Sequence, residues 1–226
     1  MILWFLLALL LLMILALPSW WVARVLQQHS LPRPDFPGTG GDMARHLLQL
    51  HGLADVQVES TSSGDHYDPS ARTVRLTADK LDGRSLTAVV VAAHEVGHAI
   101  QHARGETLFH ARTGLAWLAI WLQRLAPAAV LIAPLLLTVM PAASRLAIGL
   151  AVVAMLTGLL VHLLTLPVEL DASFNKALPM LADGDYLQEQ DMQYARRILQ
   201  AAAFTYVAAS LANLLNVWQW FRMLRR

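Results

Sequence analysis

The residues best suited to chemistry are His94, Glu95 and His98, which stand together in the segment HEVGH. Residues four apart on a helix share a face, so both imidazoles can reach one metal ion while Glu95 points to the same side. Neutral imidazole nitrogens suit Zn²⁺, and three protein ligands plus a water form the usual open catalytic arrangement. The spacing therefore predicts a hydrolytic zinc site in which Glu95 takes a proton from the water.

The pattern HExxH also arises by chance, so the surrounding residues must support it. The apolar residues VVVAA precede His94, and AI follows His98, so the segment can be buried in a helix. Gly97 leaves room for another group to approach closely. A histidine–glutamate pair on an apolar helix face is costly to bury without a partner or a metal ion. The chain contains no cysteine, so any metal must be held by histidine and carboxylate ligands.

The third ligand must come from another part of the chain. The longer pattern HExxHxxGxxH is absent, because positions 101 and 104 are Gln and Arg. His102 lies one turn beyond His98, but three histidines along one helix span about 12 Å at ~1.5 Å rise per residue, which favours a supporting or surface role for His102. Glu169 is the better candidate, because it follows directly on an uncharged run of membrane-spanning length. The alternative is that Pro167 begins a helix and Glu169 is only a first-turn carboxylate.

The composition defines the elements that must position these residues. Hydrophobic residues make up 56% of the chain and charged residues only 15%, whereas soluble domains have roughly 25% charged residues. Four runs lack charge and are each close to the ~20 residues of a membrane-spanning helix: Met1–Ala23, Leu125–Ser144, Leu146–Val168 and Ile198–Phe221. The fold class is therefore predicted to be a mainly α membrane protein with about four transmembrane helices. The net charge of +1 argues against a nucleic-acid partner.

The charged part of the chain predicts a small α+β, zincin-like catalytic region with a short antiparallel sheet. Asp42 is expected to cap an amphipathic helix that Gly52 ends, and Ser85 to open the helix carrying HEVGH, which Gly105 ends. Two alternating segments, 56–59 and 73–77, are expected to be the antiparallel strands. The predicted organisation is a transmembrane anchor at 1–23, the zincin-like region at 24–112, a transmembrane hairpin at 113–166, a third-ligand helical segment at 167–197, and a fourth transmembrane or interfacial helix with a basic tail at 198–226.

The hairpin returns the chain to the side of the membrane that carries His94 and His98, which is the main topological reason to choose Glu169. Basic residues near the ends of the spans are more numerous on that side. The count favours a cytoplasmic zinc site with the N-terminus outside, although the basic C-terminal tail argues the other way. The arginines on the two sides are Arg24, Arg33, Arg104, Arg112, Arg124, Arg196 and Arg197 against Arg145, Arg222, Arg225 and Arg226.

Three segments together resemble one family. HEVGHAIQ, the later LPVELDAS and the preceding DHYDPSARTVRLT are similar to the YugP-type membrane-bound neutral zinc metallopeptidases, over nearly the whole chain. A more distant likeness is to the HtpX-type membrane proteases. The resemblance implies one Zn²⁺ per chain, held by His94, His98 and Glu169. Ser173 stands where the distant relatives have an Asp, so the residue that orients a ligand stays open between Asp171 and Ser173.

These observations predict a zinc-dependent endopeptidase embedded in a bacterial-type inner or plasma membrane. Its partners would be the lipid bilayer and a polypeptide substrate that is itself a membrane or membrane-associated protein. The alternative is a catalytically idle metal-binding scaffold for partner membrane proteins. Tyr67, His66 and His162 are candidates to polarise the oxyanion, and the strand at 73–77 is a candidate to pair with an extended substrate.

Overall fold

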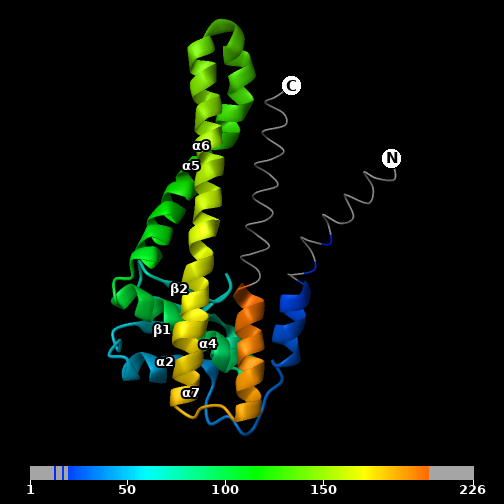
Figure 1. The fold of residues 1–226 in the computed structure, drawn as a ribbon, viewed down its shortest axis with the longest axis vertical. Coiled ribbons are helices and arrows are strands. Elements are labelled where there is room, and N and C mark those ends of the chain that lie inside the picture. The colour runs from blue at the N-terminus through cyan, green and yellow to red at the C-terminus, as the bar shows by residue number, and fades with distance from the viewer. Residues whose placement is uncertain (1–12, 14–16, 18–19, 204–226) are drawn as a thin grey trace. The chain divides into compact units, whose positions relative to one another are not determined.

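The computed structural model describes residues 13, 17 and 20–203. This part of the chain is mainly helical with one small sheet (Figure 1). Two helical segments, 20–28 and 189–203, lie near its two ends. The elements between them are α2 (Gly40–Leu50), β1 (Gln57–Thr61), β2 (His66–Asp68), β3 (Thr73–Thr77), α3 (Ala78–Leu81), α4 (Leu86–Ala103), α5 (Thr107–Val139), α6 (Pro141–Leu170), the π-helix η1 (Asp171–Ala177) and α7 (Leu178–Asp183).

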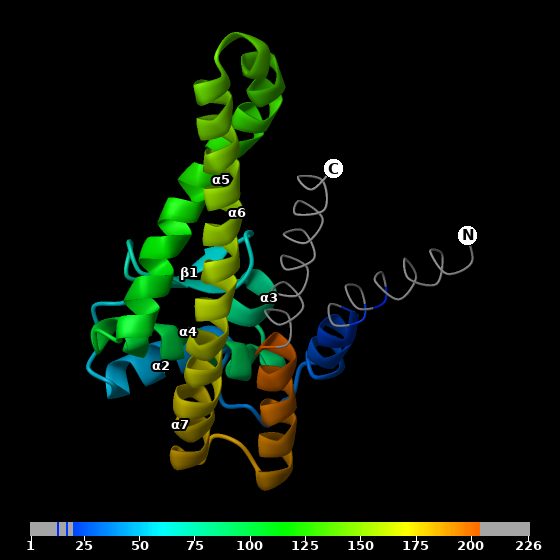
Figure 2. The same ribbon diagram turned by 45° about the horizontal axis from the view of Figure 1, so that its top comes forward.

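The chain forms two compact units. Among the described residues, the first unit comprises 20–106 and 168–203, and the second comprises Thr107–Pro167. Segments far apart in sequence meet inside the first unit. The His29 ring lies 4.7 Å from the Tyr194 ring, and Arg33 Nη1 lies 2.7 Å from the Asp191 carboxylate. These contacts hold helix 189–203 beside helix 20–28 (Figures 1 and 2).

Helix α2 begins one turn earlier than expected, and its cap is not Asp42. Thr39 is the N-cap, because its hydroxyl accepts the Asp42 N–H at 3.1 Å while the Asp42 carboxylate accepts the Thr39 N–H at 2.9 Å. This reciprocal capping box uses both side chains, so Asp42 takes part as the third helical residue. Two glycines, Gly40 and Gly41, then allow α2 to approach the backbone of Lys80, Leu81 and Ala88.

The sheet is mixed, so the prediction of two antiparallel strands is wrong. β1 pairs with β3 in parallel, and β2 pairs with β3 antiparallel, in the order β1-β3-β2. The segment between the two expected strands contains a third strand, β2. Its Tyr67 is buried, and the Asp68 carboxylate accepts the backbone N–H groups of Ser70 and Ala71 in the turn into β3. The chain crosses from β1 to β2 on the far side of β3, so β1 and β3 are neighbours that run in the same direction.

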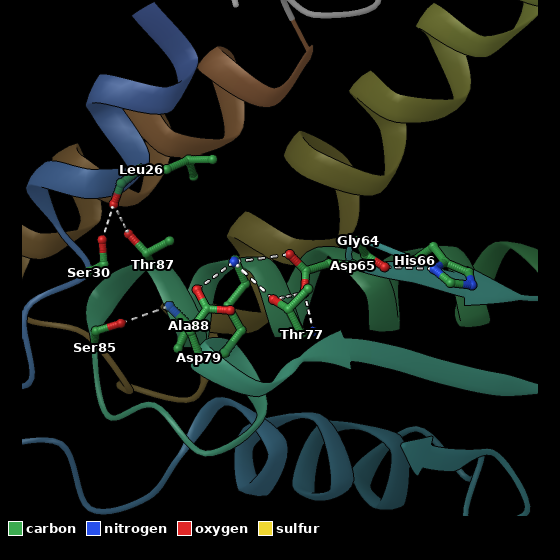
Figure 3. Close-up of polar contacts among 11 residues, drawn as sticks. Leu26, Ser30, Gly64, Asp65, His66, Thr77, Asp79, Ser85, Thr87 and Ala88 are labelled. Atoms are coloured by element: carbon green, nitrogen blue, oxygen red, sulfur yellow. Dashed lines mark hydrogen bonds and ion pairs between the residues drawn. The ribbon is translucent and has the colours of Figure 1, made fainter. Parts of the chain in front are cut away.

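Helix α4 begins and ends as predicted. Ser85 is its N-cap and accepts the Ala88 N–H at 3.2 Å, and Gly105 follows its C-cap with φ +65° (Figure 3). The Thr87 hydroxyl donates to the Leu26 carbonyl at 2.8 Å, which fixes the first turn against the N-terminal helix (Figure 3). Nearly every residue of α4 from Leu86 to Gln101 is buried, so the helix runs through the core of the first unit.

The second unit consists of the long helices α5 and α6, joined at Met140 (Figure 2). By length and composition both could cross a membrane, and only 6% and 17% of the residues in their most apolar stretches are buried. These are the two candidate spans among residues 13, 17 and 20–203. Most of the predicted first span and most of the predicted fourth lie outside those residues. Pro127 and Pro134 lie inside α5, whereas Pro141 begins α6.

Candidate metal centre

His94 and His98 lie one turn apart on α4 and face Glu169 at the end of α6. The Glu169 Oε2 atom lies 3.1 Å from His94 Nε2 and 3.4 Å from His98 Nε2. All three side chains are buried, and one potential ligand atom from each lies within 4.8 Å of the others. The structure thus brings together the three residues expected to hold a metal ion.

The chemistry of this donor set fits Zn²⁺. Two imidazole nitrogens and one carboxylate oxygen form a tridentate set that zinc accepts, with a further position left for water or substrate. The set carries one formal negative charge when both imidazoles are neutral, which a buried dication would more than offset. Closely spaced acceptors in a buried site are what a metal-binding centre requires.

Glu95 lies beside the ligands on α4 and is 6% exposed. Burial raises the pKa of the Glu95 carboxyl to about 7, and the nearby Glu169 charge acts in the same direction. The His94 ring and a hydrogen bond from the Tyr67 backbone N–H favour the ionised form and limit that rise in pKa. The carboxyl group is therefore held between the ligand histidines and the strand β2.

The second ring nitrogen of each histidine also has a partner. Ser173 Oγ lies 3.1 Å from His94 Nδ1, and Gln101 Oε1 lies 2.9 Å from His98 Nδ1. Ser173 is fully buried, and Gln101 is 1% exposed. Such outer contacts fix the orientation and tautomer of ligand histidines in metal sites.

Asp171 does not contact a histidine directly, but it accepts a hydrogen bond from Gln101, which in turn contacts His98. The Gln101 amide nitrogen donates to Asp171 Oδ2 at 2.8 Å, and the Lys176 ammonium forms a close ion pair with the same carboxylate. Lys176 is 6% exposed and also lies 2.8 Å from Glu106 Oε1. Residues five apart become neighbours in a π-helix, which is why η1 can pair Asp171 with Lys176.

Both supporting candidates therefore have a place near the ligands, at different histidines. Pro167 lies inside α6, so the alternative in which it begins a helix and Glu169 is a first-turn carboxylate is wrong. The chain stays helical from α6 through η1, which keeps Glu169, Asp171 and Ser173 on one continuous stretch.

Gly97 allows this stretch to approach α4. A Cβ atom at Gly97 would lie 2.8 Å from the Ala172 carbonyl oxygen, which is closer than real Cβ atoms come to backbone, and 3.3 Å from the Ala172 Cα. The backbone of η1 thus packs directly against α4 at Gly97.

The remaining candidates are arranged differently. The His102 ring contacts Tyr67, whose hydroxyl lies 2.8 Å from His102 Nδ1, and His102 is not part of the three-residue cluster. His66 lies on β2 with its Nδ1 2.8 Å from the Gly64 carbonyl (Figure 3). His162 lies within α6 in the second unit. β3 has a neighbour on both sides, so the segment 73–77 cannot accept an added strand.

Two residues near the site were not expected from the sequence. Gln101 was noted only as a position that lacks a ligand, although its spacing of three from His98 places both on one helix face. No sequence pattern predicts a role for Lys176. Its two partners come close only in the folded chain, Asp171 through the π-helix and Glu106 through the end of α4.

Comparison with known proteins shows the family of this chain. The family model described as "Putative neutral zinc metallopeptidase" matches residues 4–225. The chain belongs to this family of zinc metallopeptidases.

One relative with a curated description is "Putative membrane protease YugP" of Bacillus subtilis (strain 168). It is 35% identical to this chain over 181 residues, which cover 79% of this chain and 77% of the relative. The resemblance to YugP-type metallopeptidases is thereby confirmed. No solved structure matches the chain.

Proposed function

We propose that this protein is a zinc-dependent endopeptidase of the membrane, with one Zn²⁺ per chain held by His94, His98 and Glu169. The observation that carries the proposal is the meeting of the three ligand atoms within 4.8 Å, two from α4 and one from the end of α6. Family membership and the two apolar helices support the same reading.

Glu95 is proposed as the general base. When bound, zinc supplies a Lewis acid that polarises the substrate carbonyl and lowers the pKa of a water toward ~7. The Glu95 carboxylate takes the proton of the attacking water and passes it to the leaving amine. The burial of Glu95 limits competing contacts with bulk water, and Ser173 and Gln101 keep the two imidazoles in place.

The strand β2 is proposed as the place where an extended polypeptide lies. Within the described part of the chain, β2 pairs with β3 on one side only, and the Tyr67 N–H on this strand is directed toward the Glu95 carboxylate. A peptide added beside β2 would receive backbone hydrogen bonds from the strand, and its scissile bond would lie next to Glu95. This arrangement requires an unfolded or extended segment as substrate.

The proposed substrates are membrane or membrane-associated proteins. His94 and His98 lie on α4, which precedes α5 in the chain, and Glu169 lies in the last turn of α6, and both α5 and α6 are long and apolar enough to cross a bilayer. The excess of arginine at the corresponding ends of the helices supports a cytoplasmic site in a bacterial-type inner or plasma membrane.

Glu95 separates this proposal from the alternative of an inactive metal-binding scaffold. A scaffold needs only the three ligands, whereas hydrolysis also needs a carboxylate that is free to accept a proton. Glu95 provides that group next to the ligands, and this favours the enzyme.

The test is Glu95→Gln in the full-length protein, assayed on an unfolded membrane protein in detergent. We expect zinc to be retained and cleavage to fall by at least about 100-fold, the usual range for loss of a general base. Glu59→Gln, at an exposed position on β1, is the matched control and should keep full activity. Undiminished cleavage by the Glu95 variant would refute the mechanism.

A further inference from the structure

The amide group of Gln101 has its orientation fixed by its neighbours. Its Nε2 atom lies 2.8 Å from the Val168 carbonyl oxygen and 2.8 Å from Asp171 Oδ2. A carbonyl and a carboxylate only accept hydrogen bonds. Turning the amide over would set its oxygen against both acceptors, so Oε1 must face His98.

This orientation determines which nitrogen of His98 carries the proton. Gln101 Oε1 can only accept, so His98 Nδ1, at 2.9 Å, must donate. A neutral imidazole has a single N–H, which leaves a lone pair on His98 Nε2. That atom lies 3.4 Å from Glu169 Oε2, at the side of the ring from which a metal would be bound.

His94 is not controlled in the same way. Its Nδ1 atom faces the hydroxyl of Ser173, which can either donate or accept. The Ser173 contact therefore orients the His94 ring without selecting a tautomer. Among the two ligand histidines, a defined tautomer is imposed on His98, and Gln101 imposes it.

We propose that Gln101 is a positioning residue that holds His98 as the Nδ1–H tautomer and turns its Nε2 toward Glu169, with Asp171 as the anchor of the amide. The inference rests on the proposed zinc site and assigns to Gln101 and Asp171 a role in the affinity of that site.

The anchor is itself constrained. Asp171 accepts a hydrogen bond from Asn175 at 2.9 Å and pairs with the buried Lys176 ammonium. Gln101 is 1% exposed, so water cannot readily replace its hydrogen bonds. A substitution of Asp171 should therefore alter the orientation of the Gln101 amide and, through it, the hydrogen bond to His98.

The first test is the zinc affinity of the full-length protein, measured by competition with a chelator of known affinity. Gln101→Met keeps the side-chain length and removes the amide. We expect zinc binding to weaken by about 10–100-fold, the usual effect of removing a partner of a ligand histidine. Gln49→Met makes the same chemical change at an exposed position on α2 and should bind zinc as the parent does. Equal affinity of all three proteins would overturn the inference.

The second test separates positioning from mere packing. Gln101→Glu sets two carboxylates together at the place where an amide met Asp171, so it should weaken zinc binding at least as much as Gln101→Met. In the double variant Gln101→Glu with Asp171→Asn, the carboxylate at position 101 still accepts from His98, and the amide at position 171 can donate to that carboxylate instead of repelling it. We expect it to recover at least tenfold in affinity over Gln101→Glu. No recovery would contradict the positioning role.

The third readout does not depend on activity. Nitrogen-15 spectra of histidine-labelled, zinc-loaded protein should show a slowly exchanging Nδ1–H for His98. This signal should exchange much faster in Gln101→Met and be unchanged in Gln49→Met. If the parent protein binds no zinc, the proposed function fails. If it binds zinc and the His98 signal is the same in Gln101→Met, only the role of Gln101 fails.

Discussion

At the scale of single residues, each of the two histidines proposed to bind zinc has a second polar contact on the far side of its ring. Ser173 stands behind His94, and Gln101 stands behind His98. Because all of these side chains are buried, their rotamers are set by neighbours and not by solvent. A buried, preorganised set of donors binds a metal without a large loss of side-chain entropy.

Glu169 is expected to be required for zinc. Replacing it by alanine in Glu169→Ala leaves two imidazoles and removes the only carboxylate of the cluster. We expect the zinc content of the purified protein to fall well below one per chain, as it should in His94→Ala. Metal analysis by mass spectrometry measures this directly, and Glu189→Ala, at an exposed carboxylate, is the control. Full zinc occupancy in Glu169→Ala would remove Glu169 from the ligand set.

A site residue could be predicted from the sequence when its partners are close to it along the chain. His94 and His98 could be predicted because a spacing of four has one geometric meaning on a helix. Glu169 could be predicted only through topology, since it is 71 residues from His98 in the sequence. The roles of Gln101 and Lys176 depend on where η1 meets α4, and no local spacing encodes that contact.

At the scale of elements, the contact between η1 and α4 is so close that it restricts which residue can stand at position 97. It requires a residue without a side chain at Gly97, and it brings the Ala172 backbone against the helix that carries both histidines. The two elements can then share hydrogen bonds at Ser173 and Asp171.

Gly97→Ala is expected to separate these elements. The added Cβ would lie 2.8 Å from a backbone oxygen, so η1 must move away from α4. Overpacking of this kind costs about 1–3 kcal/mol, and the expected result is a lower midpoint of thermal unfolding together with weaker zinc binding.

The matched control is Gly114→Ala on α5, where no atom lies within 4 Å of an added Cβ. This helical glycine should tolerate alanine, with a gain of roughly 0.5–1 kcal/mol from the lower backbone entropy of the unfolded chain. The explanation for Gly97 would be wrong if both variants unfolded at the same temperature.

Elements with a local sequence signal were predicted well, and those set by long-range pairing were not. Ser85 and Gly105 mark the ends of α4 through hydrogen bonding and a positive φ, both of which are local. The partner of β1 depends on how the chain crosses over, so the parallel pairing was missed. The π-helix was missed because its extra residue per turn is favoured by Asp171 pairing with Lys176, which the sequence alone does not reveal.

At the scale of the whole molecule, a pair of apolar helices interrupts the part of the chain that builds the site. The first unit is made from sequence on both sides of this pair. The hydrophobic excess of the composition thus has two roles, because the same residues that suit a bilayer also connect the two halves of the ligand set.

The proposed orientation can be tested by cysteine labelling, since the chain contains no cysteine of its own. Met140→Cys lies between α5 and α6, and Ser63→Cys lies between β1 and β2, both at exposed positions. With the zinc site in the cytoplasm, a membrane-impermeant maleimide should label Met140→Cys in intact cells and Ser63→Cys only after permeabilisation. The reverse pattern would place the site on the outer side.

The division of the ligands across the apolar helices has a consequence for a chain that is still being made. Until the ribosome has released the last turn of α6, the growing protein holds two imidazoles and lacks the carboxylate that completes the proposed site. The proposed hydrolysis therefore cannot begin before the α5–α6 pair has been synthesised, and the order of translation keeps the nascent chain inactive until then.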